Sequence, residues 1–192
     1  MPSYTRAELE AFRDKEVDDL LGPHVKLLFV GINPGLMTAA TGVHFNHPGN
    51  RFYPALTLAG IVDMSDFKRG TPLTASQRKR LTDCGIGITN LVRRATPKAS
   101  ELSTAELRDG GKRLERLVTR IQPNVVAVAG VTAYRQAFGR PRAKVGRQKE
   151  SLAGAVLYAV PNPSGLNAND TIDTLAAAYR DAAIAAGIEV TR

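Results

Sequence analysis

Leu27-Leu28-Phe29-Val30 runs directly into Gly31-Ile32-Asn33-Pro34-Gly35, an apolar strand pattern that ends in a tight turn. The same arrangement returns far along the chain, where Val156-Leu157-Tyr158-Ala159-Val160 leads into Asn162-Pro163-Ser164-Gly165-Leu166-Asn167. Short continuous apolar runs are typical of parallel strands that are buried on both faces. In an open α/β sheet, the site lies in the crevice beyond the carboxyl ends of such strands. We therefore expect the two turns, distant in sequence, to contribute to one site.

The remaining patterns alternate between strands and helices. They predict two further strands at 86–89 and 125–129, helices at about 5–21, 51–60, 74–82, 103–121, 130–138 and 171–187, and loops at 36–50 and 139–150. Thr5 with Glu8, and Ser103 with Glu106, have the capping-box spacing that begins a helix. Four apolar strands alternating with helices predict a parallel sheet covered by helices on both faces.

Length and cysteine content limit the class of protein. The chain has 192 residues, which suits one compact domain (1–192), and a single cysteine, Cys84, which excludes an internal disulfide framework and a four-cysteine iron–sulfur cluster. We expect Cys84 to be a small buried hydrophobic residue rather than a nucleophile. No apolar run has the length of a membrane span, so we expect a cytoplasmic protein with no membrane contact.

The net charge of +8 and the sequence pI near 9.9 indicate a polyanionic partner. Between residues 135 and 149 there are no acidic residues and six basic ones: Arg135, Arg140, Arg142, Lys144, Arg147 and Lys149. Further basic residues are Arg51, Lys68, Arg69, Arg93 and Arg94. A solvated basic surface would have the same composition, so charge alone leaves both interpretations open. The absence of Trp argues against an aromatic platform for single strands.

The two turns offer two different kinds of chemistry. Asn33 cannot act as a general base, but its amide can hold and orient a water molecule. Such a group suits a reaction whose leaving group departs readily, as when a nucleobase leaves an oxocarbenium-like deoxyribose. Leu166 is an apolar side chain among polar neighbours, and on a basic face it could enter a base stack as a wedge. A turn-forming role for Asn33 and a core contact for Leu166 remain the alternatives.

His44 and His47 are spaced like a pair of metal ligands. No cysteine or carboxylate cluster accompanies them in the sequence, so we expect a pocket or loop role and no metal or other cofactor.

Four motifs in this order carry a family resemblance: Gly31-Ile32-Asn33-Pro34-Gly35-Leu36, Phe45-Asn46-His47-Pro48-Gly49-Asn50-Arg51-Phe52, Gly87-Ile88-Thr89-Asn90-Leu91-Val92 and Asn162-Pro163-Ser164-Gly165-Leu166. They resemble the mismatch-specific uracil-DNA glycosylase and thymine-DNA glycosylase family of the uracil-DNA glycosylase superfamily, over about residues 23–186. Residues 1–22 would be an N-terminal helical extension. The resemblance implies a three-layer α/β/α fold with a short, mainly parallel central sheet. It also implies a monofunctional hydrolase of N-glycosyl bonds that needs no metal and initiates base excision repair.

The resemblance also assigns roles to particular residues. Asn33 would orient the hydrolytic water, and Phe45 would stack on the flipped base while groups near Ile32 and Phe45 read the base edge. Leu166 would enter the duplex, with the backbone of Gly165 and Asn167 contacting the unpaired guanine. Residues expected to contact or shape the contact with DNA are Asn162, Ser164, Gly165, Leu166, Asn167, Arg142 and Lys144. The partner would be double-stranded DNA containing uracil or a mismatched pyrimidine, bound by a monomer in a bacterial-type, nucleoid-associated setting.

Some positions depart from the family pattern. Thr38 stands where relatives carry other small residues, beside the 5-substituent of the pyrimidine, so acceptance of thymine stays open. Asn90 resembles the thymine-type branch, whereas 162–165 resembles the bacterial uracil-type branch, and 167–170 differs from the usual ending of the wedge loop. Two other functions compete: a damage-sensing DNA-binding module with little turnover, and a hydrolase of RNA or nucleosides, which would have no need for Leu166.

Overall fold

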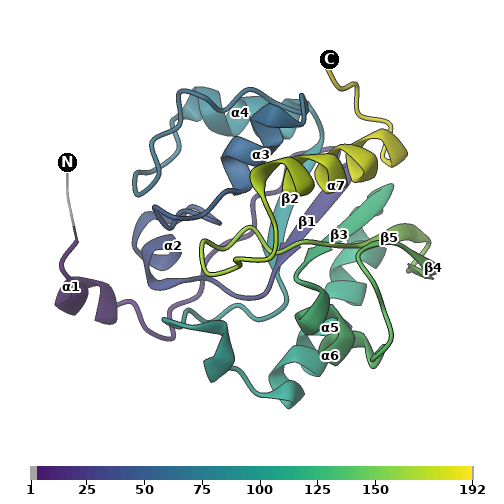
Figure 1. Ribbon diagram of the computed structural model, residues 1–192. Coiled ribbons are helices and arrows are strands. Elements are labelled where there is room, and N and C mark those ends of the chain that lie inside the picture. The colour runs from purple at the N-terminus through teal and green to yellow at the C-terminus, as the bar shows by residue number, and fades with distance from the viewer. Residues whose placement is uncertain (1–3, 192) are drawn as a thin grey trace.

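A computed structural model describes residues 4–191. One sheet of five strands runs through the centre in the order β2-β1-β3-β5-β4 (Figure 1). The strands are β1 (Leu27–Gly31), β2 (Ile86–Asn90), β3 (Val125–Ala129), β4 (Gly146–Leu152) and β5 (Ala155–Val160). Neighbours among β2, β1, β3 and β5 are parallel, and β4 pairs with β5 in the antiparallel direction. The sheet is therefore mainly parallel, as the sequence predicts.

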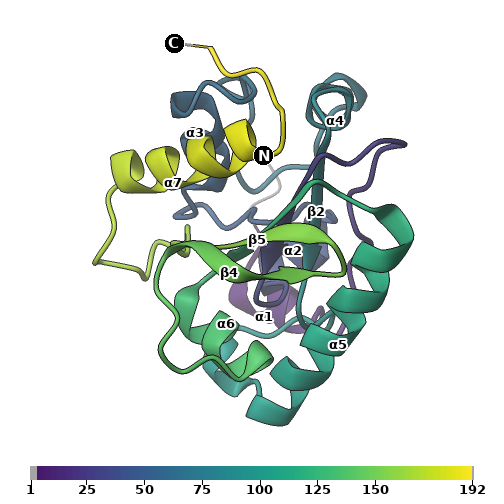
Figure 2. The same ribbon diagram turned by 90° about the vertical axis from the view of Figure 1, so that its right-hand side faces the viewer.

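Helices cover both faces of this sheet (Figures 1 and 2). The helices are α1 (Arg6–Glu10), α2 (Leu36–Thr41), α3 (Phe52–Leu58), α4 (Ala75–Asp83), α5 (Thr104–Ile121), α6 (Val131–Phe138) and α7 (Ile172–Ala185), with a 3₁₀ turn at Ala99–Glu101. The side chains of α3, α4 and α7 pack on one face of the sheet, and those of α5 and α6 pack on the other. The predicted three-layer α/β/α fold is confirmed.

The alternation of side chains along β1 explains how one strand serves two cores. Leu27 and Phe29 belong to the core beneath α3 and α7, whereas Leu28 and Val30 belong to the core beneath α5. All four are fully buried, because successive side chains of a strand point to opposite faces. Within residues 4–191, no helix combines the length and the apolar character that crossing a bilayer requires.

The helix predicted at 5–21 is wrong in its length. The capping box of Thr5 and Glu8 forms, but the helix ends at Glu10 and the backbone turns at Asp14, whose φ is 61°. Beyond this point Leu20 exchanges two backbone hydrogen bonds with Ile88 of β2. Val17 and Leu20 are buried in this segment, so pairing with the edge of the sheet prevails over the helical periodicity. Residues 1–3 of the predicted extension lie outside the described residues.

Two loop predictions also differ from the structure. The segment 36–50 begins with the six-residue helix α2, which ends at Gly42 with φ of 68°. The segment 139–150 contains most of β4, which the sequence analysis missed, because this edge strand is polar and largely exposed. A two-residue turn joins β4 to β5, with φ of 47° at Ala153 and 89° at Gly154. Positive φ at both positions is the geometry that matches the twist of a hairpin.

The carboxyl ends of the four parallel strands meet at one edge of the sheet. In the register of the sheet, Gly31 at the end of β1 pairs with Asn90 at the end of β2. On the other side of β1, β3 ends at Ala129 beside Val160 of β5. Connections leave β1 and β3 toward opposite edges of the sheet, so this edge is a topological switch point, where open α/β sheets bind ligands.

Candidate active site

The side chain of Asn33 is held by one end of its amide. Nδ2 donates hydrogen bonds to the Thr96 hydroxyl at 2.7 Å, the Arg94 carbonyl at 3.1 Å and the Pro34 carbonyl at 3.2 Å. Two of these acceptors are carbonyl oxygens, which cannot donate, so the amide nitrogen rather than the oxygen must face them. Asn33 Oδ1 forms no hydrogen bond with any residue in 4–191. The anchoring thus fixes the amide and leaves its oxygen available as an acceptor.

The backbone that anchors Asn33 is itself fixed by ion pairs. Arg94 donates to Glu106 at 2.6 Å and to Asp14 at 2.9 Å. The hydrogen bond from Arg94 lowers the pKa of Glu106 to about 2, so this carboxylate is charged at neutral pH. Thr96 is 1 % exposed, and its hydroxyl donates to the Lys98 carbonyl at 2.9 Å, which leaves a lone pair for Asn33.

An aromatic ring and a second amide lie over the end of β1. Phe45 stacks on Phe52, with ring centroids 4.2 Å apart and an interplanar angle of 27°. A Cβ atom on Gly31 would lie 2.3 Å from Asn90 Oδ1 and 3.1 Å from the Phe45 ring. Only glycine leaves room for both groups at this position. The structure therefore brings Phe45 and Asn90 together at the first turn.

His44 orients the amide of Asn90. The His44 Nε2 atom lies 2.9 Å from the Asp18 carbonyl, which can only accept, so Nε2 carries the proton. His44 Nδ1 then accepts from Asn90 Nδ2, also at 2.9 Å. Burial lowers the pKa of His44, which favours this neutral form. With its nitrogen held by His44, Asn90 presents its oxygen toward Gly31 and the first turn.

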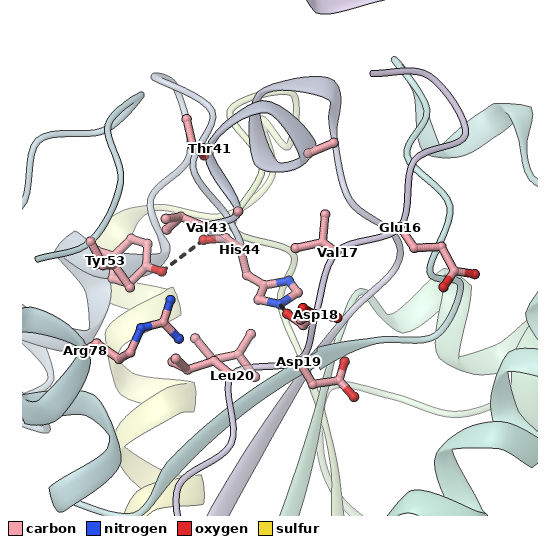
Figure 3. Close-up of a pocket in the computed structure, with 14 residues that line it drawn as sticks. Glu16, Val17, Asp18, Asp19, Leu20, Thr41, Val43, His44, Tyr53 and Arg78 are labelled. Carbon is pink, nitrogen blue, oxygen red and sulfur yellow. Dashed lines mark hydrogen bonds between the residues drawn. The ribbon is translucent and has the colours of Figure 1, made fainter. Parts of the chain in front are cut away.

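A cavity of about 390 Å³ lies on another side of His44 (Figure 3). Its lining includes the carboxylates of Glu16, Asp18 and Asp19, and neither Asn33 nor Phe45 contributes to it. The close-up shows the Tyr53 hydroxyl bonded to the His44 carbonyl, at 3.0 Å, on the wall of this cavity. Because neither Asn33 nor Phe45 lines it, this cavity is separate from the turn that carries Asn33.

The second turn forms a closed loop with one exposed apolar side chain. Leu166 is 88 % exposed. Two side chains fold the backbone around it: Ser164 N donates to Asn162 Oδ1 at 3.0 Å, and Leu166 N donates to Ser164 Oγ at 3.2 Å. Asn167 Nδ2 closes the loop by donating to the Asn162 carbonyl at 2.9 Å. We call residues 162–170 the wedge loop. The core contact considered for Leu166 is absent among the described residues.

The two turns meet across the end of β3. A Cβ atom on Gly130 would lie 3.4 Å from Ile32 and 3.8 Å from the amide nitrogen of Asn162. Gly165 of the wedge loop lies against Gly49, where an added Cβ would be 2.7 Å from the Gly49 carbonyl. The two distant turns therefore lie close together, as the sequence predicts, and their sharing of one site stays a prediction.

The structure divides the basic residues into two groups. Arg94 is paired as described above, Arg93 lies near Glu16 and Asp18, and Arg140 bonds Glu150 at 3.0 Å. Arg142, Lys144, Arg147 and Lys149 are exposed and form no ion pair within residues 4–191. Gly146, next to this group, pairs with Ala159 near the carboxyl end of β5, so the free charges begin near the wedge loop.

The remaining candidate residues are buried, partly buried or already hydrogen-bonded. Thr38 is 4 % exposed on α2. Cys84 is half-buried against the core, and burial raises its thiol pKa, which disfavours a nucleophilic thiolate. Both ring nitrogens of His44 are hydrogen-bonded, and His47 Nδ1 accepts from Gly49 N at 3.1 Å. In the described part of the chain no three His, Cys, Asp or Glu residues form a group that could hold a metal ion.

Sequence reasoning missed the residues that position this site. The sequence analysis does not single out Thr96 and counts Arg94 only among the basic residues, although both follow β2 at the same sheet edge as Asn33. Arg51 was counted as surface charge, yet it bonds the wedge loop. For His44 the sequence predicted a pocket or loop role but not the hydrogen bond to Asn90. Its place directly before Phe45 was the available signal.

Comparison with known proteins agrees with this geometry. A family model described as the uracil DNA glycosylase superfamily matches residues 19–183. Among solved structures, the solution NMR structure of a candidate uracil DNA glycosylase from Methanosarcina acetivorans is similar, with a TM-score of 0.60 and 15 % identity. The match covers 88 % of this chain and 96 % of that one. At this identity the likeness concerns the fold.

Proposed function

Because the chain belongs to the uracil DNA glycosylase superfamily, we propose that it is a monofunctional glycosylase of the mismatch-specific uracil and thymine type. Its substrate is duplex DNA containing uracil or a related damaged or mismatched pyrimidine, and excision begins base excision repair. The observation that carries the proposal is Asn33, whose amide is anchored through nitrogen while its oxygen stays free at the ligand-binding edge of the sheet.

In this mechanism, Asn33 Oδ1 accepts a hydrogen bond from the hydrolytic water and aims the water oxygen at C1′. The C1′–N1 bond breaks first, its electron pair leaves with the base as an anion, and the sugar becomes oxocarbenium-like. The water oxygen then bonds to C1′ and its proton passes to solvent or to the departed base. Asn33 takes up no proton, because an amide is not a base in this range. Its contribution is orientation of the water.

The flipped base stacks on the free face of Phe45, whose other face is supported by Phe52 at 4.2 Å. Asn90 Oδ1 accepts from the base edge, because His44 holds the amide nitrogen of Asn90 at 2.9 Å. Backbone groups near Ile32 and Phe45 read the remaining base edge. Thr38 lies next to the 5-position and limits which pyrimidines enter.

Duplex DNA lies across the wedge loop and the free basic residues. Leu166, 88 % exposed, fills the space that the extruded base leaves. The backbone of Gly165 and Asn167 contacts the orphaned guanine, while Asn162 and Ser164 approach the phosphates. Arg142 and Lys144 neutralise phosphates without sequence preference.

A DNA-binding sensor with little turnover is the second candidate. It would share the wedge loop and the basic residues, so the two candidates differ only in the need for Asn33. A hydrolase of nucleosides or RNA has less support, because it gives no reason for a leucine that is 88 % exposed.

Single-turnover cleavage of labelled DNA distinguishes these candidates. The substrates are duplexes with G·U, A·U and G·T pairs and single-stranded uracil, with Asn33→Ala as the inactive control. We expect abasic product from uracil duplexes with the wild type and almost none with the variant. Tight binding of uracil duplex with no product above the Asn33→Ala level would support the sensor instead.

A further inference from the structure

Arg51 connects the pocket to the wedge loop. Its guanidinium donates to three backbone carbonyls of that loop: Ser164 at 3.1 Å, Asn167 at 2.8 Å, and Asp170. The backbone N–H of Arg51 adds a fourth bond, to the Pro163 carbonyl at 2.9 Å. One residue therefore bonds the loop at four points along its length.

Arg51 also stands next to the aromatic stack of the pocket. It immediately precedes Phe52, the ring on which Phe45 stacks at a centroid distance of 4.2 Å. Around it the two segments approach closely, since a Cβ on Gly165 would lie 2.7 Å from the Gly49 carbonyl. Arg51 is thus the charged side chain that spans the contact between the Phe45 segment and the wedge loop.

The chemistry of arginine suits this task and makes a phosphate contact unsuitable. A planar guanidinium carries five donors in a fixed fork, so it can bond several carbonyls at once, which a lysine ammonium on a flexible stem does poorly. Both terminal nitrogens of Arg51 are directed at loop carbonyls. The Nε atom is buried and has no partner within residues 4–191. The donors are therefore directed inward, toward protein, rather than outward toward DNA.

We propose that Arg51 is a positioning residue that fixes the wedge loop relative to the base pocket, so that Leu166 can hold an extruded base against Phe45. The inference rests on the proposed function. In a duplex, the base stack presses against Leu166 and the loop must resist displacement. Without Arg51 the loop yields, and the extruded base returns to the stack. A single-stranded substrate has no base stack for Leu166 to fill, so its excision should depend little on the bonds from Arg51 to the wedge loop.

The test is a double-mutant cycle between Arg51→Gln and Leu166→Ala. Single-turnover excision is measured on a uracil duplex and on single-stranded uracil DNA. We expect Arg51→Gln to reduce the ratio of the duplex rate to the single-strand rate about tenfold, since hydrogen bonds from a charged donor are lost. In the Leu166→Ala background the same change should alter the ratio of the two rates by less than about twofold, because both act through one wedge.

Two variants serve as matched controls. Arg51→Lys keeps the charge but not the fork, and should behave nearly as Arg51→Gln does. Arg69→Gln removes a nearby exposed arginine that donates to the Asn50 carbonyl at 2.9 Å and does not bond the wedge loop, and it should retain the wild-type ratio. Equal losses on both substrates, full additivity with Leu166→Ala, or rescue by lysine would overturn the proposal.

Hydrogen exchange of the free protein provides a readout that needs no activity. Arg51→Gln should accelerate exchange in 162–170 by about tenfold or more and leave α5 as in the wild type. Unchanged exchange in the wedge loop would overturn the proposal that Arg51 fixes this loop. If the wild type produces no abasic sites, the proposed glycosylase function fails, but this measurement still decides whether Arg51 fixes the loop.

Discussion

The Asn33 turn and the wedge loop both follow a buried parallel strand, yet they present their key residues in opposite ways. Asn33 is partly buried and held by three acceptors, so that one oxygen is left free. Leu166 is 88 % exposed at the tip of a loop whose polar groups bond one another and Arg51. In each case hydrogen bonds fix the surrounding groups, and neither Asn33 Oδ1 nor the Leu166 side chain has a hydrogen-bond partner within residues 4–191. Fixed surroundings are therefore common to both. The two groups differ in polarity, and in the proposed function the polar one orients water and the apolar one enters the duplex.

Removing the free oxygen should have the largest effect. Asn33→Ala is expected to lower single-turnover excision of uracil by about a hundredfold or more on duplex and single strand alike, because the water loses its orientation. Binding to uracil duplex should persist, since the change removes little docking surface. A loss of tenfold or less would mean that another group positions the water, and loss of binding would indicate a structural role in the turn.

Thr96→Val weakens the anchoring of Asn33 without removing the Asn33 side chain. Valine keeps the shape of the buried Thr96 but removes the acceptor 2.7 Å from Asn33 Nδ2. Two carbonyl acceptors remain for Asn33, so we expect a smaller loss, about tenfold in rate. The loss should again be the same for both substrates. A change in the ratio of duplex to single-strand rates would show that the two regions are not separable.

Leu166→Ala should affect the wedge loop alone and therefore change the duplex rate more than the single-strand rate. The duplex rate is expected to fall by about tenfold, whereas the single-strand rate changes little, because extrusion from a stack costs a few kcal/mol and a single strand has no stacked partner to replace. Rates on a matched uracil duplex and on single-stranded uracil check this. Equal losses on both would mean that Leu166 supports the pocket rather than the DNA stack.

Local sequence signals predicted the strands that carry both turns, because apolar runs such as 27–30 and 156–160 need only burial to become strands. They failed where tertiary contacts decide. Leu20 pairs with Ile88 across 68 positions of the chain instead of continuing a helix. β4 has too few apolar residues to signal a strand and forms by pairing with β5. The motifs predicted the turn at Asn33 and the loop at Leu166. The bond between Thr96 and Asn33 and those from Arg51 to 164–170 join segments more than 60 positions apart, which no local pattern specifies.

Removing free charge should weaken docking without separating the two regions. Arg142→Gln with Lys144→Gln is expected to weaken binding to all duplexes alike and to lower the magnitude of the log–log salt slope by about 1.8, or about 0.9 for each lost phosphate contact. Fluorescence anisotropy at several salt concentrations measures the slope. Lys79→Gln, which removes a lysine paired with Asp83 on α4, is the control for loss of charge elsewhere. An unchanged slope would mean that 142–144 does not touch the DNA backbone.

The smallest effect should be a pH dependence of stability and of excision that arises from His44, next to Asn90, and not from the wedge loop. Burial lowers the pKa of His44 from its ordinary 6.5, so the unfolded chain binds a proton there before the folded one does. The free energy of unfolding should therefore be highest above pH 6.5 and decrease as the pH falls, by at most about 1.4 kcal/mol per pH unit for one proton. Urea denaturation at several pH values measures this, and His44→Gln should flatten the profile, with His24→Gln as the control for removing an exposed imidazole.

Protonated His44 cannot accept from Asn90 Nδ2, so excision should decrease at acid pH equally on duplex and single strand. A pH-dependent ratio of the two rates would instead connect His44 to the wedge loop, and the separation of the two regions would not hold.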